Sequence, residues 1–144
     1  MFKDKTVAIV GDAEIPVCTK DVYAHDIVIC MNNNKHNIEP DVYCYSAIQF
    51  IDKYPDVIRW HMSPKNRDKA PEGVKFYEEH RWHILYNTLM GSRPTTGMMT
   101  IDMVREGKAK KITLFGFDFY DTGKCSAVHS PNDERRLCQE WGIL

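Results

Sequence analysis

The sequence predicts one α/β domain of the Rossmann-like class, with a mainly parallel sheet and helices on both faces. Short apolar runs, such as residues 6–10 and 112–115, alternate with segments that have helical spacing. Several runs end in Gly, Asn or Asp, as buried parallel strands do before a turn. The 144 residues suffice for a single domain spanning 1–144, and 43% apolar with 27% charged content is ordinary for a globular protein.

The first half of the chain is dominated by predicted strands. We expect strands at residues 6–10, 26–31, 41–45 and 57–62, a short helix near 19–24, and a second helix at 47–53 that breaks before Pro55. Within 41–45, Val42 and Cys44 alternate with Tyr43 and Tyr45. Residues 63–73 are rich in Pro, Gly and charge, which predicts an exposed loop.

The second half contains the longer predicted helices. We expect an edge strand at 74–77, a helix at 80–90, a strand around 112–115, a loop at 121–128 and a final helix at 131–141. A further helix follows Thr95 and Thr96 and ends at Gly107. Its spacing predicts one apolar and one polar face, formed by Met98, Ile101 and Val104 and by Thr100, Asp102 and Arg105 respectively.

Several turns are expected to meet at one edge of the sheet. Gly11, Asn32 and Gly116 each follow a predicted strand, and ligands bind beyond the carboxyl ends of parallel strands. The Thr95–Thr96 loop opens a helix, whose free N–H groups and dipole favour an anion such as a phosphate. Local features alone favour an ordinary capped helix followed by a buried strand at 91–120, and a solvated turn is as good an interpretation of Asn32 to Asn34 as a ligand contact.

Composition and missing motifs exclude several function classes. A net charge of −1 argues against binding nucleic acid or a membrane surface through charge. The chain has no apolar run of membrane-spanning length and opens with no signal peptide, so we expect a cytoplasmic protein. It contains neither Gly-x-Gly-x-x-Gly nor Gly-x4-Gly-Lys-Ser/Thr, which argues against a dinucleotide dehydrogenase and a P-loop enzyme.

Neither the cysteines nor the histidines predict a metal site. The five cysteines are odd in number, widely spaced and without a Cys-x-x-Cys pair, so we expect free thiols: Cys18, Cys30, Cys44, Cys125 and Cys138. His80 and His83 stand three residues apart on a predicted helix, but no third ligand is evident, so we interpret them as surface histidines.

Three motifs resemble those of the family 29 sialyltransferases. PTTGMMTIDMV followed by KKITLFGFDFY is similar to the small sialylmotif. VAIVGD followed by HDIVICMN resembles the large sialylmotif, with its Val-Val-Gly-Asn and His-Asp-x-Val-Ile-Arg-x-Asn. His129 and Glu134 have the His-x4-Glu spacing of the very small motif. The three stand in the family's order and cover most of the chain.

This resemblance implies a GT-A-like variant of the Rossmann fold and a metal-independent transfer with inversion. The donor would be a CMP-sugar, no separate cofactor would be needed, and the acceptor would be a glycan or another hydroxyl. Position by position, the motifs imply a donor site formed by Gly11, Asp12, Asn32, Ser92, Thr95, Thr96, Gly97, Gly116 and Tyr120. His129 would be the general base, with Glu134 orienting its ring or holding the acceptor hydroxyl.

The sequence also departs from the family pattern. Cys30 replaces the usual Arg, and residues 121–128 lack the histidine of the family's His-Tyr motif. Either Tyr120 serves the leaving phosphate instead, or the site is degenerate. Val7 and Ala109 stand where animal members have bridging cysteines. The chain is shorter than those members, so the acceptor site would be formed by small loops, by a partner chain such as a second copy, or not at all.

Two alternatives stay open. One is a nucleotide-binding module that has lost catalysis, and the other is a different nucleotide enzyme on the same scaffold. The local reading of residues 129–134 is a helix start, with Ser130 as N-cap, Pro131 in the first turn and Asp133 as a capping-box carboxylate. The helix dipole disfavours imidazolium at His129 and the charge of Glu134 favours it, so the net effect is undecided.

Overall fold

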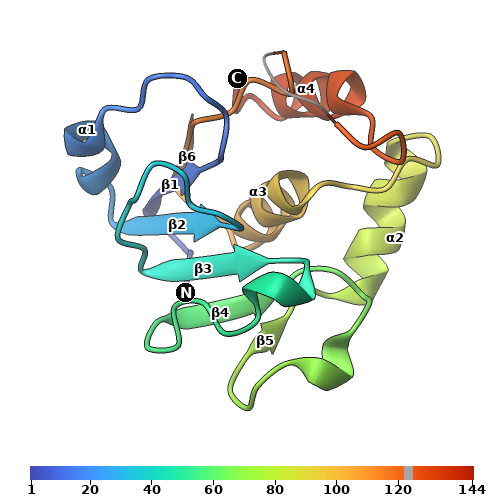
Figure 1. Ribbon diagram of the computed structural model, residues 1–144. Helices are drawn as coiled ribbons and strands as arrows, with labels where there is room; N and C mark the ends of the chain where they lie inside the picture. Colours follow the sequence, from blue (N-terminus) through green and yellow to red (C-terminus); the bar gives the residue numbers. More distant parts are fainter. Residues whose placement is uncertain (122–124) are drawn as a thin grey trace.

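Six parallel strands form the centre of the molecule, in the order β5-β4-β3-β2-β1-β6 (Figure 1). The computed structural model describes residues 1–121 and 125–144. The strands are β1 (Thr6–Val10), β2 (Ile27–Met31), β3 (Val42–Tyr45), β4 (Ile58–His61), β5 (Lys75–Phe76) and β6 (Lys111–Phe115). The predicted α/β class and parallel sheet are therefore confirmed, with β5 at one edge as expected.

Helices cover both faces of this sheet (Figure 1). On one face α2 (Glu79–Thr88), α3 (Thr96–Glu106) and α4 (Pro131–Glu140) pack against Val7 and Ile9 of β1. On the other face α1 (Thr19–Tyr23) and the 3-10 turn η1 (Ile48–Phe50) pack against Ala8 and Val10. Successive residues of a strand point to opposite faces, so a central strand covered on both sides is apolar throughout.

Two local expectations need correction. The helix predicted at 47–53 is only the short turn η1, and the loop predicted at 63–73 contains a second 3-10 turn, η2 (Arg67–Lys69). In β3 the expected alternation is present: Val42 and Cys44 belong to the core cluster on one face of the sheet, and Tyr43 and Tyr45 belong to the cluster on the other, so all four residues are buried. Helices and loops cover both faces of β3, so Tyr43 and Tyr45 are enclosed as completely as Val42 and Cys44.

Helix α3 is buried on more than its apolar face. Its ends agree with the prediction: the hydroxyl of Thr95 accepts from the N–H of Met98 at 3.1 Å, and Gly107 is the C-cap. The predicted polar face is only partly open to solvent: Arg105 is exposed, whereas Thr100 and Asp102 have no exposed surface. Asp102 lies under α2, where it accepts hydrogen bonds from the hydroxyl of Tyr77 at 2.5 Å and from Arg81 Nη2 at 2.6 Å. A buried carboxylate is tolerated here because both oxygens have donors.

Helix α4 begins where the sequence predicts, but its first side chains form a different hydrogen bond from the predicted one. Ser130 is the N-cap and Pro131 occupies the first turn. The hydroxyl of Ser130 donates to Asp133 Oδ2 at 2.5 Å, and no side-chain cap to the helix backbone forms. The expected capping box is therefore replaced by a bond between the two side chains.

All five cysteines are free, as the sequence predicts. Cys30, Cys44 and Cys138 are buried in the core, and burial raises the pKa of each thiol to about 12. Among residues 1–121 and 125–144, no helix has the length and apolar character needed to cross a bilayer. The cytoplasmic location stays a prediction.

Candidate active site

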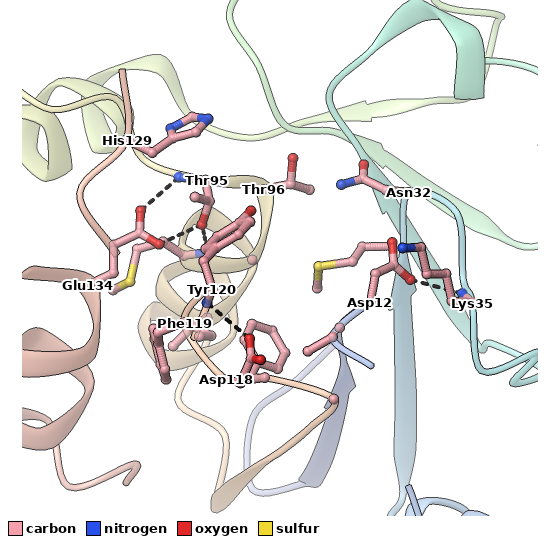
Figure 2. A pocket seen from close by; sticks show the side chains of 18 of the residues that line it. Asp12, Asn32, Lys35, Thr95, Thr96, Asp118, Phe119, Tyr120, His129 and Glu134 are labelled. Atoms are coloured by element: carbon pink, nitrogen blue, oxygen red, sulfur yellow. Dashed lines mark hydrogen bonds between the residues drawn. The ribbon is translucent and has the colours of Figure 1, made fainter. Parts of the chain in front are cut away.

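A pocket of about 410 Å³ opens where β1, β2 and β6 end and α3 begins (Figure 2). Ten of the eleven residues implied by the family motifs line it: Gly11, Asp12, Asn32, Thr95, Thr96, Gly97, Gly116, Tyr120, His129 and Glu134. They come from segments more than 100 residues apart in the sequence, and the parallel sheet brings the segments together. The predicted crevice at the carboxyl ends of the strands is confirmed.

Gly11 and Gly116 form the floor of the pocket by packing against each other. A Cβ atom at Gly11 would lie 2.7 Å from the carbonyl oxygen of Gly116, and one at Gly116 would lie 2.6 Å from that of Gly11. Gly116 also has φ +67°, in the left-handed region that favours glycine. The contact between the β1 and β6 turns therefore requires both glycines.

Asp12 holds the loop that follows β2. Its carboxylate accepts from the N–H of Asn33 at 3.2 Å and from the N–H of Lys35 at 2.9 Å. From the other side, Lys53 Nζ donates to the carbonyl of Asn33 at 2.7 Å, and the hydroxyl of Tyr43 donates to the carbonyl of Asn32 at 2.6 Å. These contacts fix the loop that follows β2. They also explain why the carboxylate of Asp12 stands next to a predicted phosphate site.

The loop after β2, held in place by these hydrogen bonds, positions Asn32 at the wall of the pocket (Figure 2). Asn32 has φ +47°, a left-handed conformation that Asn adopts more readily than most residues. Its side-chain Oδ1 is buried and has no hydrogen-bond partner among the residues that the structure describes. Such an atom normally accepts a hydrogen bond, so a ligand N–H or O–H group in the pocket would satisfy it.

The N-terminus of α3 forms a second wall, and Glu134 of α4 lies against it. Glu134 Oε2 accepts from the N–H of Thr95 at 2.9 Å, and Oε1 accepts from the Thr95 hydroxyl at 2.6 Å (Figure 2). The carboxylate is 3% exposed. Burial raises the pKa of Glu134 to about 7, and the two hydrogen bonds from Thr95 oppose this rise.

Thr95 therefore has a different role from the one expected. Its hydroxyl accepts from Met98 and donates to Glu134, so its proton is already used inside the protein. Thr96 follows in the first helical position, and its hydroxyl lies 2.5 Å from Ser46 Oγ at the end of β3. The N–H groups of Thr96 and Gly97 have no acceptor within the helix, because a helix leaves its first N–H groups free. These two groups are the ones available for an anion.

Gly97 is required by an aromatic neighbour. A Cβ atom there would lie 2.7 Å from the ring of Phe117, which follows Gly116. Phe117 thus packs directly on the first turn of α3 and ties it to the end of β6. Sequence reasoning did not assign Phe117 to the site, although it stands inside the small-motif match.

His129 lies at the mouth of the pocket and does not pair with Glu134. Its Nδ1 is 2.7 Å from the carbonyl oxygen of Arg93. A carbonyl only accepts, so Nδ1 carries the hydrogen and Nε2 of the neutral ring keeps a free lone pair. The backbone of the loop before α3 therefore orients the ring, instead of Glu134 as we expected.

Tyr120 closes the pocket from the side of the β6 loop (Figure 2). Phe119 and Tyr120 both have positive φ, at +51° and +64°, and the N–H of Tyr120 bonds to Asp118 Oδ1 at 3.0 Å. Two successive left-handed residues make a sharp turn that directs the phenol back over the pocket. Partial burial raises the pKa of the Tyr120 hydroxyl, which keeps it protonated and able to donate.

One expected residue lies elsewhere, and one unexpected residue is present. Ser92 is not part of the pocket wall, because its N–H bonds to Leu89 in the turn that ends α2. Lys35 does line the pocket and lies 4.0 Å from the exposed carboxylate of Glu14. The position of Lys35 just beyond the Asn cluster was the only sequence signal for it. Residues 122–124, part of the segment predicted as a loop, lie outside the described residues.

The histidine pair on α2, His80 and His83, does not line this pocket. His80 Nδ1 lies 3.1 Å from Glu78, His83 Nε2 lies 3.9 Å from Glu79, and all four side chains are largely exposed. In the described part of the chain, no group of three or more His, Cys, Asp or Glu side chains is arranged to hold a metal ion.

Comparison with known proteins identifies the fold. No family model matches the sequence, and no curated protein matches it. Among solved structures, a mammalian sialyltransferase in complex with Gal-beta-1-3GalNAc-ortho-nitrophenol superimposes with a TM-score of 0.71 at 14% identity. A second mammalian sialyltransferase structure gives 0.67 at 15% identity. Each comparison covers 96% of this chain and 66% of the matched chain.

These matches define the class of the protein by its fold. The chain has the glycosyltransferase-like α/β fold of the mammalian sialyltransferases. The chain spans only part of the matched chains, 66% of the length of each. At this level of identity the likeness establishes the fold, and fold alone does not fix an activity.

Proposed function

We propose that this protein is a metal-independent glycosyltransferase that transfers a sugar, sialic acid or a similar one, from a CMP-sugar to an acceptor hydroxyl with inversion. The observation that carries the proposal is the convergence in one pocket of residues from all three motif matches. Gly11 and Asn32 come from the large-motif match, Thr96 and Gly116 from the small-motif match and His129 from the very small motif match. A shared fold with the mammalian sialyltransferases adds independent support.

The donor would lie between the two walls of the pocket. Its phosphate would accept from the N–H groups of Thr96 and Gly97, where the α3 dipole favours negative charge. The hydroxyl of Tyr120 would donate to the same phosphate as the bond to the sugar breaks. The unpartnered Oδ1 of Asn32 would accept from the base or ribose of the nucleotide.

His129 would act on the acceptor. Because its Nδ1–H is held by the carbonyl of Arg93, its Nε2 is free to remove the proton of an acceptor hydroxyl. The hydroxyl oxygen then attacks the anomeric carbon while the bond to CMP breaks. This single displacement inverts the anomeric configuration. Electrostatic stabilisation of the departing phosphate replaces a metal ion in this scheme.

Calorimetric titration with CMP in the presence of EDTA tests donor binding. We expect saturable binding that EDTA does not weaken, and weaker binding after Asn32→Ala. The control is Glu39→Ala, a substitution of an exposed side chain outside the pocket. Absence of detectable binding at millimolar CMP, or binding only with added metal, would contradict the proposal.

Turnover tests the catalytic part. With a CMP-activated sialic acid as donor and Gal-beta-1-3GalNAc as acceptor probe, we expect His129→Gln to lower the rate by ~10²–10⁴-fold. CMP affinity should change little, because Nε2 serves the acceptor and not the nucleotide. An unchanged rate in this variant would remove His129 from the mechanism.

A second candidate function is a CMP-binding module without transfer. The specific observation in its favour is that Glu134 is bonded to Thr95 and does not assist His129. Binding of CMP by the wild-type protein without turnover on a panel of hydroxyl acceptors would support this alternative.

A further inference from the structure

Glu134 is an internal anion placed where a ligand anion is expected. Both of its oxygens bond to Thr95, the residue immediately before the free N–H groups of Thr96 and Gly97. It is nearly fully buried, and it lines the same pocket. Consecutive Cα atoms are ~3.8 Å apart, so a phosphate on those N–H groups would approach the carboxylate closely. A ligand phosphate and the Glu134 carboxylate in such close proximity repel each other strongly when little water screens them.

We propose that Glu134 couples phosphate binding to proton uptake, so that the pocket accepts a phosphate-bearing ligand as Glu134 becomes a neutral carboxylic acid. This inference rests on the proposed function, since it requires a ligand phosphate at the N-terminus of α3. It gives Glu134 a role in selecting the charge of the ligand and not in activating the acceptor. The proton comes from the buffer and returns to it when the ligand leaves.

The protein itself prepares Glu134 for this role. Burial raises the pKa of Glu134 to about 7, so near neutral pH the side chain is partly ionised before any ligand binds. A phosphate nearby adds a like charge and moves the equilibrium further toward the protonated form. When protonated, the carboxylic acid can donate to Thr95 Oγ1 while its other oxygen still accepts the Thr95 N–H.

Other ionisable groups around Glu134 do not imitate this behaviour between pH 7.5 and 9. Tyr120 and Cys125 face it from the segment after β6, and burial raises the pKa of each. Cys138 faces it from α4, with a pKa raised to about 12. His129 before α4 and Asp12 after β1 line the same pocket, and the Glu134→Gln variant separates any contribution of theirs from that of Glu134. Lys35 carries the one lysine ammonium among the pocket-lining residues that the structure describes.

The experiment is calorimetric titration with CMP and with cytidine, repeated at several pH values between 7.5 and 9. In this range the CMP phosphate is fully ionised, because its second pKa is ~6. Binding that takes up a proton weakens as pH rises, by at most tenfold per pH unit for one proton. We expect CMP to bind about three- to tenfold more weakly at pH 9 than at pH 7.5. Cytidine, which has no phosphate, should bind equally at both.

Buffers with different ionisation enthalpies measure the proton directly. We expect the apparent enthalpy of CMP binding to depend on the buffer, with uptake of up to about one proton per ligand. In Glu134→Gln this dependence and the pH dependence should both disappear while CMP still binds. Glu140→Gln, an exposed carboxylate on the same helix, should behave as the wild-type protein does.

The outcomes separate this inference from the proposed function. Wild-type protein that does not bind CMP would contradict both. CMP binding without proton uptake, or full pH dependence retained in Glu134→Gln, would overturn the role of Glu134 alone. If Glu134→Gln does not fold, the comparison of CMP with cytidine on the wild-type protein still decides the question, because only CMP should take up a proton.

Discussion

Two carboxylates face the pocket from opposite sides, and they are used in different ways. Asp12, after β1, accepts from the N–H groups of two residues in a surface loop, and it remains partly exposed. Glu134, in α4, accepts from the N–H and hydroxyl of Thr95 and is almost completely buried (Figure 2). Each has two donors within hydrogen-bond distance. The difference between them is the access of water.

This difference determines what each side chain contributes. Water can replace Asp12 as the acceptor for the loop N–H groups, so Asp12 selects a loop conformation at modest energetic cost if lost. No water reaches the donors of Thr95 in the same way, so Glu134 is needed to join α3 to α4. The same burial that makes Glu134 structurally important also makes its ionised form unfavourable. A carboxylate can thus contribute differently to stability at two positions of the same pocket.

Removal of the buried carboxylate should have the largest effect. We expect Glu134→Ala to lower the free energy of unfolding by about 3–4 kcal/mol, because two buried donors lose their acceptor and a cavity remains. Denaturant unfolding at pH 5.5 measures it. Glu140→Ala is the matched control on the exposed face of α4 and should change stability by less than about 0.5 kcal/mol. A loss as small as that of the control would mean that water does reach Thr95.

The pH dependence of stability should be the next largest effect. The pKa of Glu134 is about 7 in the folded protein against an ordinary value of 4.5, so the folded state binds more protons between these values. The free energy of unfolding therefore falls as pH rises from 4.5 to 7 and remains lowered above it, by up to about 3 kcal/mol.

Thermal unfolding of the wild-type protein and Glu134→Gln across pH 4.5–8 isolates this contribution. Gln does not titrate, so the decline between pH 4.5 and 7 should be smaller in the variant, and the two curves should diverge over that interval. Parallel curves would show that Glu134 is not the group responsible.

Removal of the exposed carboxylate should have the smallest effect. We expect Asp12→Ala to cost only about 1 kcal/mol, because water can bond to the freed N–H groups of Asn33 and Lys35. Hydrogen exchange of these two amides should accelerate, since the loop loses its internal acceptor. Asp12→Asn, which keeps one side-chain oxygen, should fall between the wild-type protein and Asp12→Ala. If Asp12→Ala loses as much free energy of unfolding as Glu134→Ala, the exposed and the buried carboxylate contribute equally to stability, and the comparison between them is wrong.

Much of the fold was predictable because its signals are local. The apolar runs of β1 and β2, the Pro at the start of α4 and the Thr95 cap each act over a few residues. The helix expected at 47–53 is only the turn Ile48–Phe50, and beyond its C-cap Ile51 the chain reaches Tyr54 with φ +54°, a conformation in which a right-handed helix cannot continue. The sequence does not reveal such a backbone conformation at a residue other than Gly or Asn.

Most residues of the candidate site were also predictable, but their contacts were not. The family-like motifs identified ten residues of the pocket wall, and the parallel sheet brings together the turns that carry many of them. Sequence spacing suggested that Glu134 serves His129, five residues away. The structure instead bonds Glu134 to Thr95, 39 residues away, and His129 to Arg93, 36 residues away.

By itself, then, the sequence determined the class of fold, the ends of the main strands and helices, and the end of the sheet where the pocket forms. These depend on hydrophobic spacing, turn residues and the direction of parallel strands, which are properties of short segments. Only the tertiary structure decided which polar groups meet: Gly11 with Gly116, Asp102 with Arg81, and Glu134 with Thr95. The physical reason is that a buried polar group bonds to whichever donor the packing places within about 3 Å, and separation along the chain does not limit that choice.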